Sequence, residues 1–346
     1  MWLCFASAAV VAMPTGARAL AETGAPVLDF VLGVRSEGMG QTGTADASDP
    51  QNLYFNPASV AALEGVYGAG SYMLVNPRLS NDIWFGHGSL GGGYTFGTGR
   101  PIRVAADVTM ARLSYGTLSV TNPQGWSLGQ YDAKEQYIAF TVGASTAIED
   151  RFRVALALGA KRWTGDYAAE AFFVDPDSGR FSANMLDVGA IVSTVMDAGD
   201  WRVQPSVGLA CVNLGSDIET PATQNDPLPS KFNYGVSMRV LGPEVALGSA
   251  TVPTVLATLN IDGVHGLNGQ DPMWRFGSEV AFVDAVFLRW GRRVDDRYRW
   301  QTSTWGIALG VPAGKIRARL EYANFDETRD KFGATVVWLF DGTGEE

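Results

Sequence analysis

Large apolar residues recur at every second position in a series of short segments between residue 64 and the C-terminal end. In the segment 152–161, for example, Phe, Val, Leu and Leu occupy the even positions from 152 to 158, and small or basic residues occupy the odd ones. The same alternation recurs in 138–142, 186–192, 231–240, 274–282, 305–311, 316–322 and 332–340. A period of two indicates β-strands with one apolar face, so the chain is predicted to be all-β.

Such strands suit either a soluble sandwich, which buries its apolar faces against a second sheet, or a membrane barrel, which turns them to lipid. Many segments reach ~10 residues, which suits a tilted membrane-spanning strand better than a typical globular strand. The polar faces mix Gly, Ala and Ser with charges of both signs, as a narrow lumen requires. Aromatic residues gather near segment ends, where interfacial girdles lie: Trp163, Tyr167, Trp201, Phe232, Tyr234, Trp274, Trp290, Trp338 and Phe340.

The joining segments divide into two kinds. Short turns are expected at 149–150, 197–200 and 312–314, and long polar loops at 122–135, 165–183, 216–230 and 294–302. Short turns at one rim and longer loops at the other are typical of outer-membrane barrels, and roughly 20 residues per strand and loop over 64–346 gives about 14 strands. We therefore predict a closed antiparallel transmembrane β-barrel of about 14 strands, with 12 to 16 as the range.

The first 21 residues have the pattern of a secretory signal peptide. An apolar stretch over 2–13 is followed by a Pro and a Gly and then by Ala19-Leu20-Ala21, a small-x-small cleavage site, although no Lys or Arg stands at the start. A buried apolar strand is the alternative. Cleavage after Ala21 leaves Cys211 as the single cysteine, which excludes an internal disulfide from the mature chain.

Composition narrows the possible functions. Lys and Arg number 26 against 36 Asp and Glu, for a net charge of −10, which argues against a nucleic-acid partner. With two histidines and one cysteine in the mature chain, we expect no zinc site of ordinary composition. We also expect no cofactor and no enzymatic activity. A Ser–His pair of His87 with Ser80 or Ser89 lacks a nucleophile-elbow motif, and His265 is expected in a turn. The acid pairs at 175–177 and 295–296 are expected to solvate loops rather than bind Ca²⁺.

A set of charged residues falls on the polar faces of the predicted strands and should point into the lumen. One interpretation is structural, with paired charges filling the lumen and holding the N-terminal segment. The other is that the excess of arginine binds a carboxylate or another anion. The set comprises Arg103, Asp107, Arg153, Lys161, Arg239, Arg275, Glu279, Arg289, Arg293, Arg317, Arg319 and Glu321.

The segment 25–63 lacks alternation and is rich in small residues. Gly38, Gly40 and Gly43 permit close backbone approach or a positive φ. Asn56 and Pro57 are suited to the N-cap and first position of a short helix over 57–63. An ordinary surface loop is the alternative.

This segment resembles the N-terminus of the PorV/PorQ-type proteins of the FadL-like outer-membrane barrels. The match consists of Arg35, Gly38, Met39, Gly40, Ala45, Asp49, Tyr54, Asn56, Pro57 and Ala58. The chain departs from the pattern at Gln41, where Gly is usual, and at Ser59-Val60, where Gly-Leu is usual. Weaker similarity appears at 226–229, 287–291 and 322–340. The resemblance implies a plug or hatch over 22–63 inside a barrel over 64–346.

FadL-type proteins let hydrophobic molecules cross the outer membrane, whereas PorV is a non-catalytic barrel of type IX secretion. Our leading expectation is passage or binding of a hydrophobic or amphipathic small molecule, gated by the N-terminal segment. An accessory or scaffold barrel in protein secretion or surface attachment is the alternative, and a soluble secreted β-protein is third. The resemblance implies the outer membrane of a Gram-negative-type bacterium, with outer-membrane lipid and a small molecule or a secreted protein as partners.

Overall fold

The computed structural model describes residues 24–339, apart from 76, 78–79, 98–99, 123, 149–150, 168–178, 220–224, 269–271, 296–300 and 326–328, and apart from the side chains of 120, 295 and 301. The predicted signal peptide, the 149–150 turn, the two acid pairs and Phe340 therefore lie wholly or partly outside the described residues.

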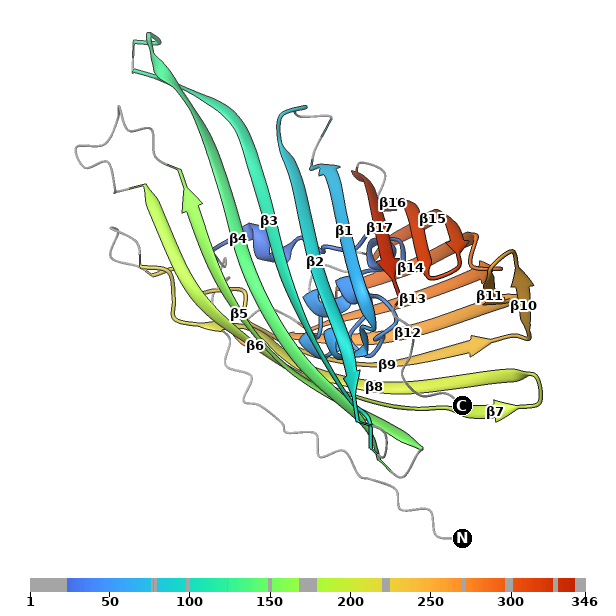
Figure 1. Cartoon of the computed structure of the whole chain (residues 1–346). Helices are drawn as coiled ribbons and strands as arrows, with labels where there is room; N and C mark the ends of the chain where they lie inside the picture. The colour runs from blue at the N-terminus through green and yellow to red at the C-terminus, as the bar shows by residue number, and fades with distance from the viewer. Residues whose placement is uncertain are drawn as a thin grey trace.

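Within the described residues, fourteen strands form one closed antiparallel sheet (Figure 1). Neighbours in sequence pair with each other, β1 pairs with β17, and β6 pairs with β8, so the sheet has no open edge along its length. The strands of the wall are β1 (Gly65–Leu74), β2 (Trp84–Phe96), β3 (Ile102–Thr121), β4 (Ser127–Ile148), β5 (Phe152–Asp166), β6 (Arg180–Thr194), β8 (Trp201–Gly215), β9 (Lys231–Leu241), β12 (Val255–Gly266), β13 (Met273–Phe282), β14 (Val286–Asp295), β15 (Gln301–Ala313), β16 (Ile316–Phe325) and β17 (Arg329–Trp338).

Three further strands lie at one rim. The short β7 (Met196–Ala198) pairs with the start of β8, and β10 (Glu244–Leu247) pairs with β11 (Ala250–Pro253) in a separate hairpin. The turns between β2 and β3, β13 and β14, and β15 and β16 are short and share this rim. The connections 75–83 and 216–230 are longer and lie at the opposite rim. We call the two ends the short-turn rim and the long-loop rim.

The outward and inward residues alternate as predicted. On β5, Leu156 and Leu158 are 60% and 63% exposed, whereas Ala155 and Ala157 between them are 5% and 6% exposed. A soluble sandwich would bury the leucine face, whereas a barrel in a bilayer presents it to acyl chains. The closed sheet and its apolar exterior confirm the predicted transmembrane barrel. No helix among the described residues is both long and apolar enough to cross a bilayer.

The prediction is wrong in some details of the wall. The segment 122–135 is not a loop, because β4 begins at Ser127 and β3 and β4 extend past their neighbours as a ribbon (Figure 1). Trp163 is not in an interfacial girdle, because it is 1% exposed and its Nε1 donates a hydrogen bond to Glu135 at 3.2 Å. Trp163 stands at an odd position of β5, as Ala155 and Ala157 do, and therefore faces the lumen. Its place in the strand alternation, not its closeness to the strand end, sets its side of the wall.

The N-terminal segment lies inside the barrel, as the blue ribbon in Figure 1 shows. Its elements are η1 (Pro26–Asp29), α1 (Val34–Gly38), η2 (Pro50–Tyr54) and η3 (Pro57–Ala62). The helix expected over 57–63 is η3, a 3₁₀ helix rather than an α-helix. Asn56 is its N-cap, with Oδ1 accepting a hydrogen bond from the Ala58 nitrogen at 3.0 Å. Because most side chains of this segment are buried, the surface-loop alternative is wrong, and we call residues 24–64 the plug.

Candidate functional site: an arginine-lined pocket beside the plug

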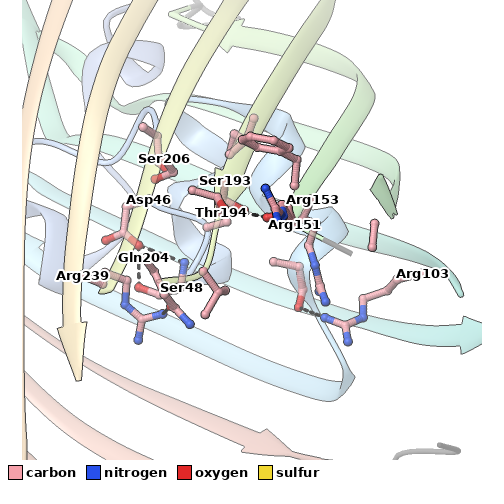
Figure 2. Close-up of a pocket in the computed structure, with 17 residues that line it drawn as sticks. Asp46, Ser48, Arg103, Arg151, Arg153, Ser193, Thr194, Gln204, Ser206 and Arg239 are labelled. Atoms are coloured by element: carbon pink, nitrogen blue, oxygen red, sulfur yellow. Dashed lines mark hydrogen bonds between the residues drawn. The ribbon is translucent and has the colours of Figure 1, made fainter. Parts of the chain in front are cut away.

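A pocket of about 470 Å³ lies at the short-turn rim between the plug and the inner wall (Figure 2). Four of its lining residues are arginines from three strands and a turn: Arg103, Arg151, Arg153 and Arg239. The plug contributes 45–48 and Ala62. The rest of the lining is hydroxyl, amide and apolar in character: Ala147, Phe152, Ile191, Ser193, Thr194, Val195, Gln204 and Ser206.

The arginines of this pocket differ in their hydrogen bonds and ion pairs. Arg103 donates from Nη2 to Glu64 at 2.6 Å and from Nη1 to the carbonyl of Ala62 at 3.0 Å, so it also fixes the end of the plug. Arg239 donates from Nη1 to Gln204 at 3.3 Å, and its Nε is buried without a hydrogen-bond partner in the described part of the chain. No ion pair joins Arg153 to another described residue.

The pocket has more positive than negative charge. Among its described lining residues Asp46 is the one carboxylate, and this group is already paired with Arg35 at 2.6 Å. Asp46 also accepts hydrogen bonds from the nitrogen and the hydroxyl of Ser48, at 2.9 and 2.5 Å. Guanidinium groups match carboxylates and phosphates in geometry, so this lining suits an anionic head group.

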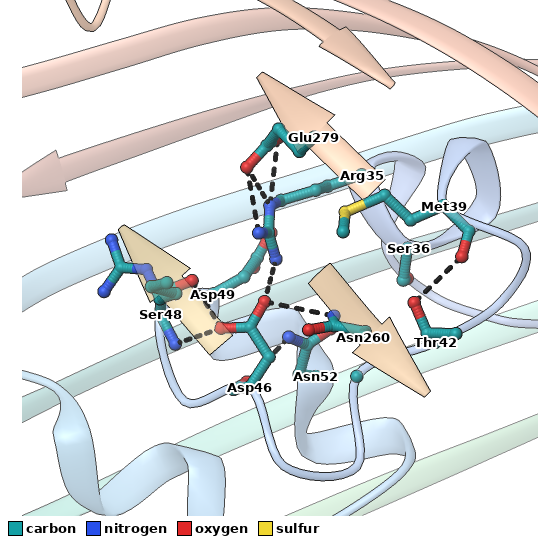
Figure 3. Close-up of polar contacts among 12 residues, drawn as sticks. Arg35, Ser36, Met39, Thr42, Asp46, Ser48, Asp49, Asn52, Asn260 and Glu279 are labelled. Carbon is teal, nitrogen blue, oxygen red and sulfur yellow. Dashed lines mark hydrogen bonds and ion pairs between the residues drawn. The ribbon is translucent and has the colours of Figure 1, made fainter. Parts of the chain in front are cut away.

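Behind the pocket, a buried ion-pair network joins the plug to the wall (Figure 3). Arg35 donates from Nη1 to Asp46, and from Nε and Nη2 to Glu279 on β13 at 2.9 to 3.1 Å. Glu279 also accepts from Arg289 Nε at 2.7 Å, and Arg289 Nη1 donates to Glu321 at 2.6 Å. Each of these side chains is at most 3% exposed, so the charges depend on one another.

The charges on the plug side of this network are strongly stabilised. Burial opposes the charge on Arg35, but Asp46 and Glu279 outweigh burial and hold the Arg35 pKa well above its ordinary value. Burial would raise the pKa of Asp46, but the Arg35 guanidinium holds the pKa of that carboxyl far below its usual range. The neighbouring Asp49 has a raised pKa because burial disfavours its charged form.

Other contacts hold the plug at further points. Asp262 on β12 accepts hydrogen bonds from the backbone nitrogens of Gly43 and Thr44 at 2.7 and 2.9 Å. Lys331 on β17 pairs with Glu37 at 3.2 Å, and Glu135 accepts from the Val27 nitrogen at 3.0 Å. Four of these residues were not predicted from the sequence: Asp46, Asp262, Lys331 and Glu135. The three wall residues could have been found from the inward phase of their strands.

The predicted lumen charges fall into three groups. The first is buried in the lumen and hydrogen-bonded: Asp107, Lys161, Arg275, Glu279, Arg289 and Glu321. The second lines the pocket: Arg103, Arg153 and Arg239. The third is partly buried: Arg293 donates to Gln41 at 3.3 Å, Arg317 pairs with Asp284 at 3.2 Å, and Arg319 lies over the ring of Phe287.

The matched motif residues have structural roles in the plug. Gly40 has a φ of +69°, and its nitrogen donates to Thr304 Oγ1 at 2.9 Å. Gly38 lies so close to the wall that a Cβ there would stand 3.1 Å from the Gly306 Cα. The side chains of Met39, Pro57 and Ala58 are buried in the plug.

The polar motif residues make hydrogen bonds within the plug. Asp49 is the N-cap of η2. Tyr54 Oη donates to the Leu28 carbonyl, and Asn56 Nδ2 donates to the Thr44 carbonyl.

His87 does not form the Ser–His pair with Ser80 or Ser89 that was considered from the sequence. His87 Nδ1 lies 2.7 Å from the hydroxyl of Ser71 instead, and Ser71 also donates to the Leu32 carbonyl. His265 is in β12 rather than in a turn, because the strand continues to Gly266. The described residues contain no group of three or more His, Cys, Asp or Glu placed to hold a metal ion.

No family model matches the chain, and no curated protein matches it either. Solved outer-membrane barrels are similar to it in structure. A Pseudomonas aeruginosa FadL homologue has 10% identity and a TM-score of 0.43, with 89% of this chain and 98% of that chain covered.

Two further solved structures are also similar to this chain. The TodX deltaS2S3 mutant monoaromatic hydrocarbon channel has 11% identity and a TM-score of 0.46 over 88% of this chain and 97% of its own. The β domain of the Bordetella autotransporter BrkA has 15% identity and a TM-score of 0.39 over 80% and 100%. All three TM-scores are below 0.5, so the assignment of the fold rests on the strand pairing of this chain.

Proposed function

We propose that this chain is an outer-membrane barrel of a Gram-negative-type bacterium that binds and passes an amphipathic small molecule with an anionic head. It reaches that membrane after cleavage of the segment 1–21. Its apolar exterior and its short turns at one rim support the location, with the short-turn rim toward the periplasm. The observation that carries the proposed ligand class is the arginine-lined pocket beside the plug.

The size and lining of the pocket suit such a ligand. A volume of about 470 Å³ is in the usual range for small-molecule sites. Arg153 and Arg239 are the groups to bind the carboxylate or phosphate, because Arg103 is already paired with Glu64. Ala147, Ile191 and the plug alanines offer apolar surface to the first part of the tail.

The plug is the proposed gate. Residues 45–48 form part of the pocket lining, and Asp46 among them is held by Arg35, which is in turn held by the wall. An anion that binds Arg239 adds negative charge beside Asp46 and weakens the hold of this loop. Ligand binding at the pocket is thereby coupled to the position of the plug.

The test compares uptake of labelled decanoate and decanol into cells that express the barrel. The double variant Arg153→Gln/Arg239→Gln should reduce decanoate uptake about tenfold, since it removes two charge-assisted contacts, and should leave decanol uptake unchanged. Arg202→Gln is the matched control, because Arg202 is an exposed arginine at the same rim outside the pocket. Equal loss with both substrates, or no loss with decanoate, contradicts the proposal.

A PorV-like accessory barrel in protein secretion is the second candidate. The ribbon of β3 and β4 favours it, because Trp126 at its tip is 73% exposed and Leu118 and Leu128 are 41% and 51% exposed. A short turn in place of 118–128 removes this surface and leaves the pocket intact. Loss of a secreted protein from the cell surface with normal decanoate uptake supports the secretion role, and the reverse result supports transport.

A further inference from the structure

The outer face of β4, β5 and β6 changes from apolar to cationic within a few residues. Strand pairing places Lys134, Asp166 and Arg180 in one row across the three strands. The row Gln136, Thr164 and Ser182 follows, and then Ile138, Arg162 and Asn184. The next row toward the short-turn rim is Phe140, Ala160 and Leu186, which is wholly apolar.

An apolar groove crosses this wall below the cations. It has a volume of about 720 Å³, and its outward-facing lining includes Val108, Ile138, Phe140, Ala160, Leu186 and Leu214. Ala160 forms the floor, because this small side chain stands in the row between Phe140 and Leu186. Arg162 and Asn184 line the end of the groove nearest the long-loop rim.

The cations above the groove outnumber the acids. Four cations and one carboxylate face outward in the rows described above and at the positions of β3 that pair with them. The cations are Arg112, Lys134, Arg162 and Arg180, and the carboxylate is Asp166. Asp166 is loosely paired, at 3.9 Å from Lys134 and 3.7 Å from Arg180. A second, smaller pocket of about 270 Å³ lies between these three side chains. This surface therefore favours an anion.

The depth of these residues fits a lipid head group. Phe152 begins the apolar outer face of β5, and Arg162 follows it by ten positions. Ten residues of strand span ~33 Å, or ~25 Å along the membrane normal at the usual tilt, which is about the height of the apolar band. Arg162 and the rows beyond it then lie at the interface of the outer leaflet.

We infer that this wall binds one phosphate-bearing lipid of the outer leaflet, with an acyl chain in the groove over Ala160 and its phosphate on Arg112, Lys134 and Arg162. The inference rests on the membrane placement in the proposed function but not on the pocket beside the plug. The lipid would be a boundary lipid with a fixed position, outside the barrel and separate from any transported molecule.

The test is a titration of the full-length mature barrel, purified in detergent and stripped of lipid, with bisphosphorylated lipid A by native mass spectrometry. The triple variant Arg112→Gln/Lys134→Gln/Arg162→Gln should lower the affinity about tenfold or more, because three charge-assisted contacts are removed. Ala160→Phe should lower it about threefold by filling the groove, with no change in charge. Lipid A without phosphates should bind the wild type as weakly as lipid A binds the triple variant.

Two controls keep the result specific. Ala144→Phe adds the same side chain to an outward position of β4 outside the groove, and Arg202→Gln removes an exposed cation at the opposite rim. Both should bind lipid A as the wild type does. Heat-modifiable migration in gels verifies that every variant is folded. Equal affinity of the wild type and the triple variant, or of the two forms of lipid A, overturns the inference, while the decanoate assay judges the transport role independently.

Discussion

The guanidinium of Arg35 donates three hydrogen bonds to the carboxylate of Glu279, with distances of 2.9 to 3.1 Å. The two residues are 244 positions apart, and their contact joins the plug to β13. Both side chains are 3% exposed, so neither charge has water as an alternative partner. The pair therefore makes the position of the plug depend on the closed barrel.

Removal of one partner of this pair should loosen the plug. Glu279→Gln leaves Arg35 and Arg289 with less negative charge in a buried site, which should cost ~3–5 kcal/mol. We expect a lower thermal midpoint in gel-migration assays and protease cleavage within 30–60. Asp330→Asn is the control, since it removes a carboxylate at the exposed end of β17. An unchanged midpoint for Glu279→Gln contradicts a stabilising role of the network.

Acid should weaken the attachment of the plug through Asp46. The pKa of Asp46 is depressed in the folded state, so its contribution to stability is fully present above ~4, the ordinary aspartate pKa, and is lost as the pH falls toward the folded value. Asp49 changes stability with pH in the opposite direction, because burial raises its pKa. A variant of Asp46 alone is needed to separate the two effects. The comparison is therefore between wild type and Asp46→Asn, by thermal unfolding followed by circular dichroism.

The wild type should lose stability between pH ~5 and pH ~2 by more than Asp46→Asn does. At pH 7 the variant should be the less stable of the two, because Arg35 keeps its charge and loses one partner. Parallel pH curves for the two proteins would show that Asp46 does not carry the acid sensitivity.

Close backbone approach should make two glycines irreplaceable. A Cβ at Gly291 would overlap the backbone nitrogen of Gly40, and a Cβ at Gly40 would stand 2.5 Å from the carbonyl oxygen of Phe276. Gly291→Ala and Gly40→Ala should therefore displace the plug and raise its protease sensitivity. Gly88→Ala is the matched control, because nothing lies within 4 Å of a Cβ added there. Equal behaviour of the three variants argues against this packing.

Gln41 provides a test of backbone strain where the related pattern has Gly. Its φ is +62°, and its side chain bonds to Glu37 and Arg293. Gln41→Ala loses the side-chain contacts and keeps the strained backbone, whereas Gln41→Gly loses the contacts but relieves the strain. We expect Gly to be more stable than Ala here by ~1 kcal/mol in thermal unfolding. The opposite order would mean that the positive φ does not destabilise the protein at this position.

The sequence by itself determined the class of the wall and the phase of its strands. Alternation must divide a strand in a thin sheet into two faces, so the outward position of Leu156 and the inward position of Arg289 could be predicted from period and charge. The capping of η3 by Asn56 was also predictable, because it depends on neighbouring residues alone.

Only the tertiary structure decided which inward residues meet. The plug-to-wall pairs are Arg35 with Glu279, Glu37 with Lys331, and Glu64 with Arg103. They are set by barrel closure and by the path of the plug, and a periodic pattern in the sequence specifies neither. Girdle and lumen positions of an aromatic residue differ by one step along a strand, which is why Trp163 was assigned to the wrong face. Local periodicity specifies which side of the wall a residue occupies, but long-range contacts specify its partner.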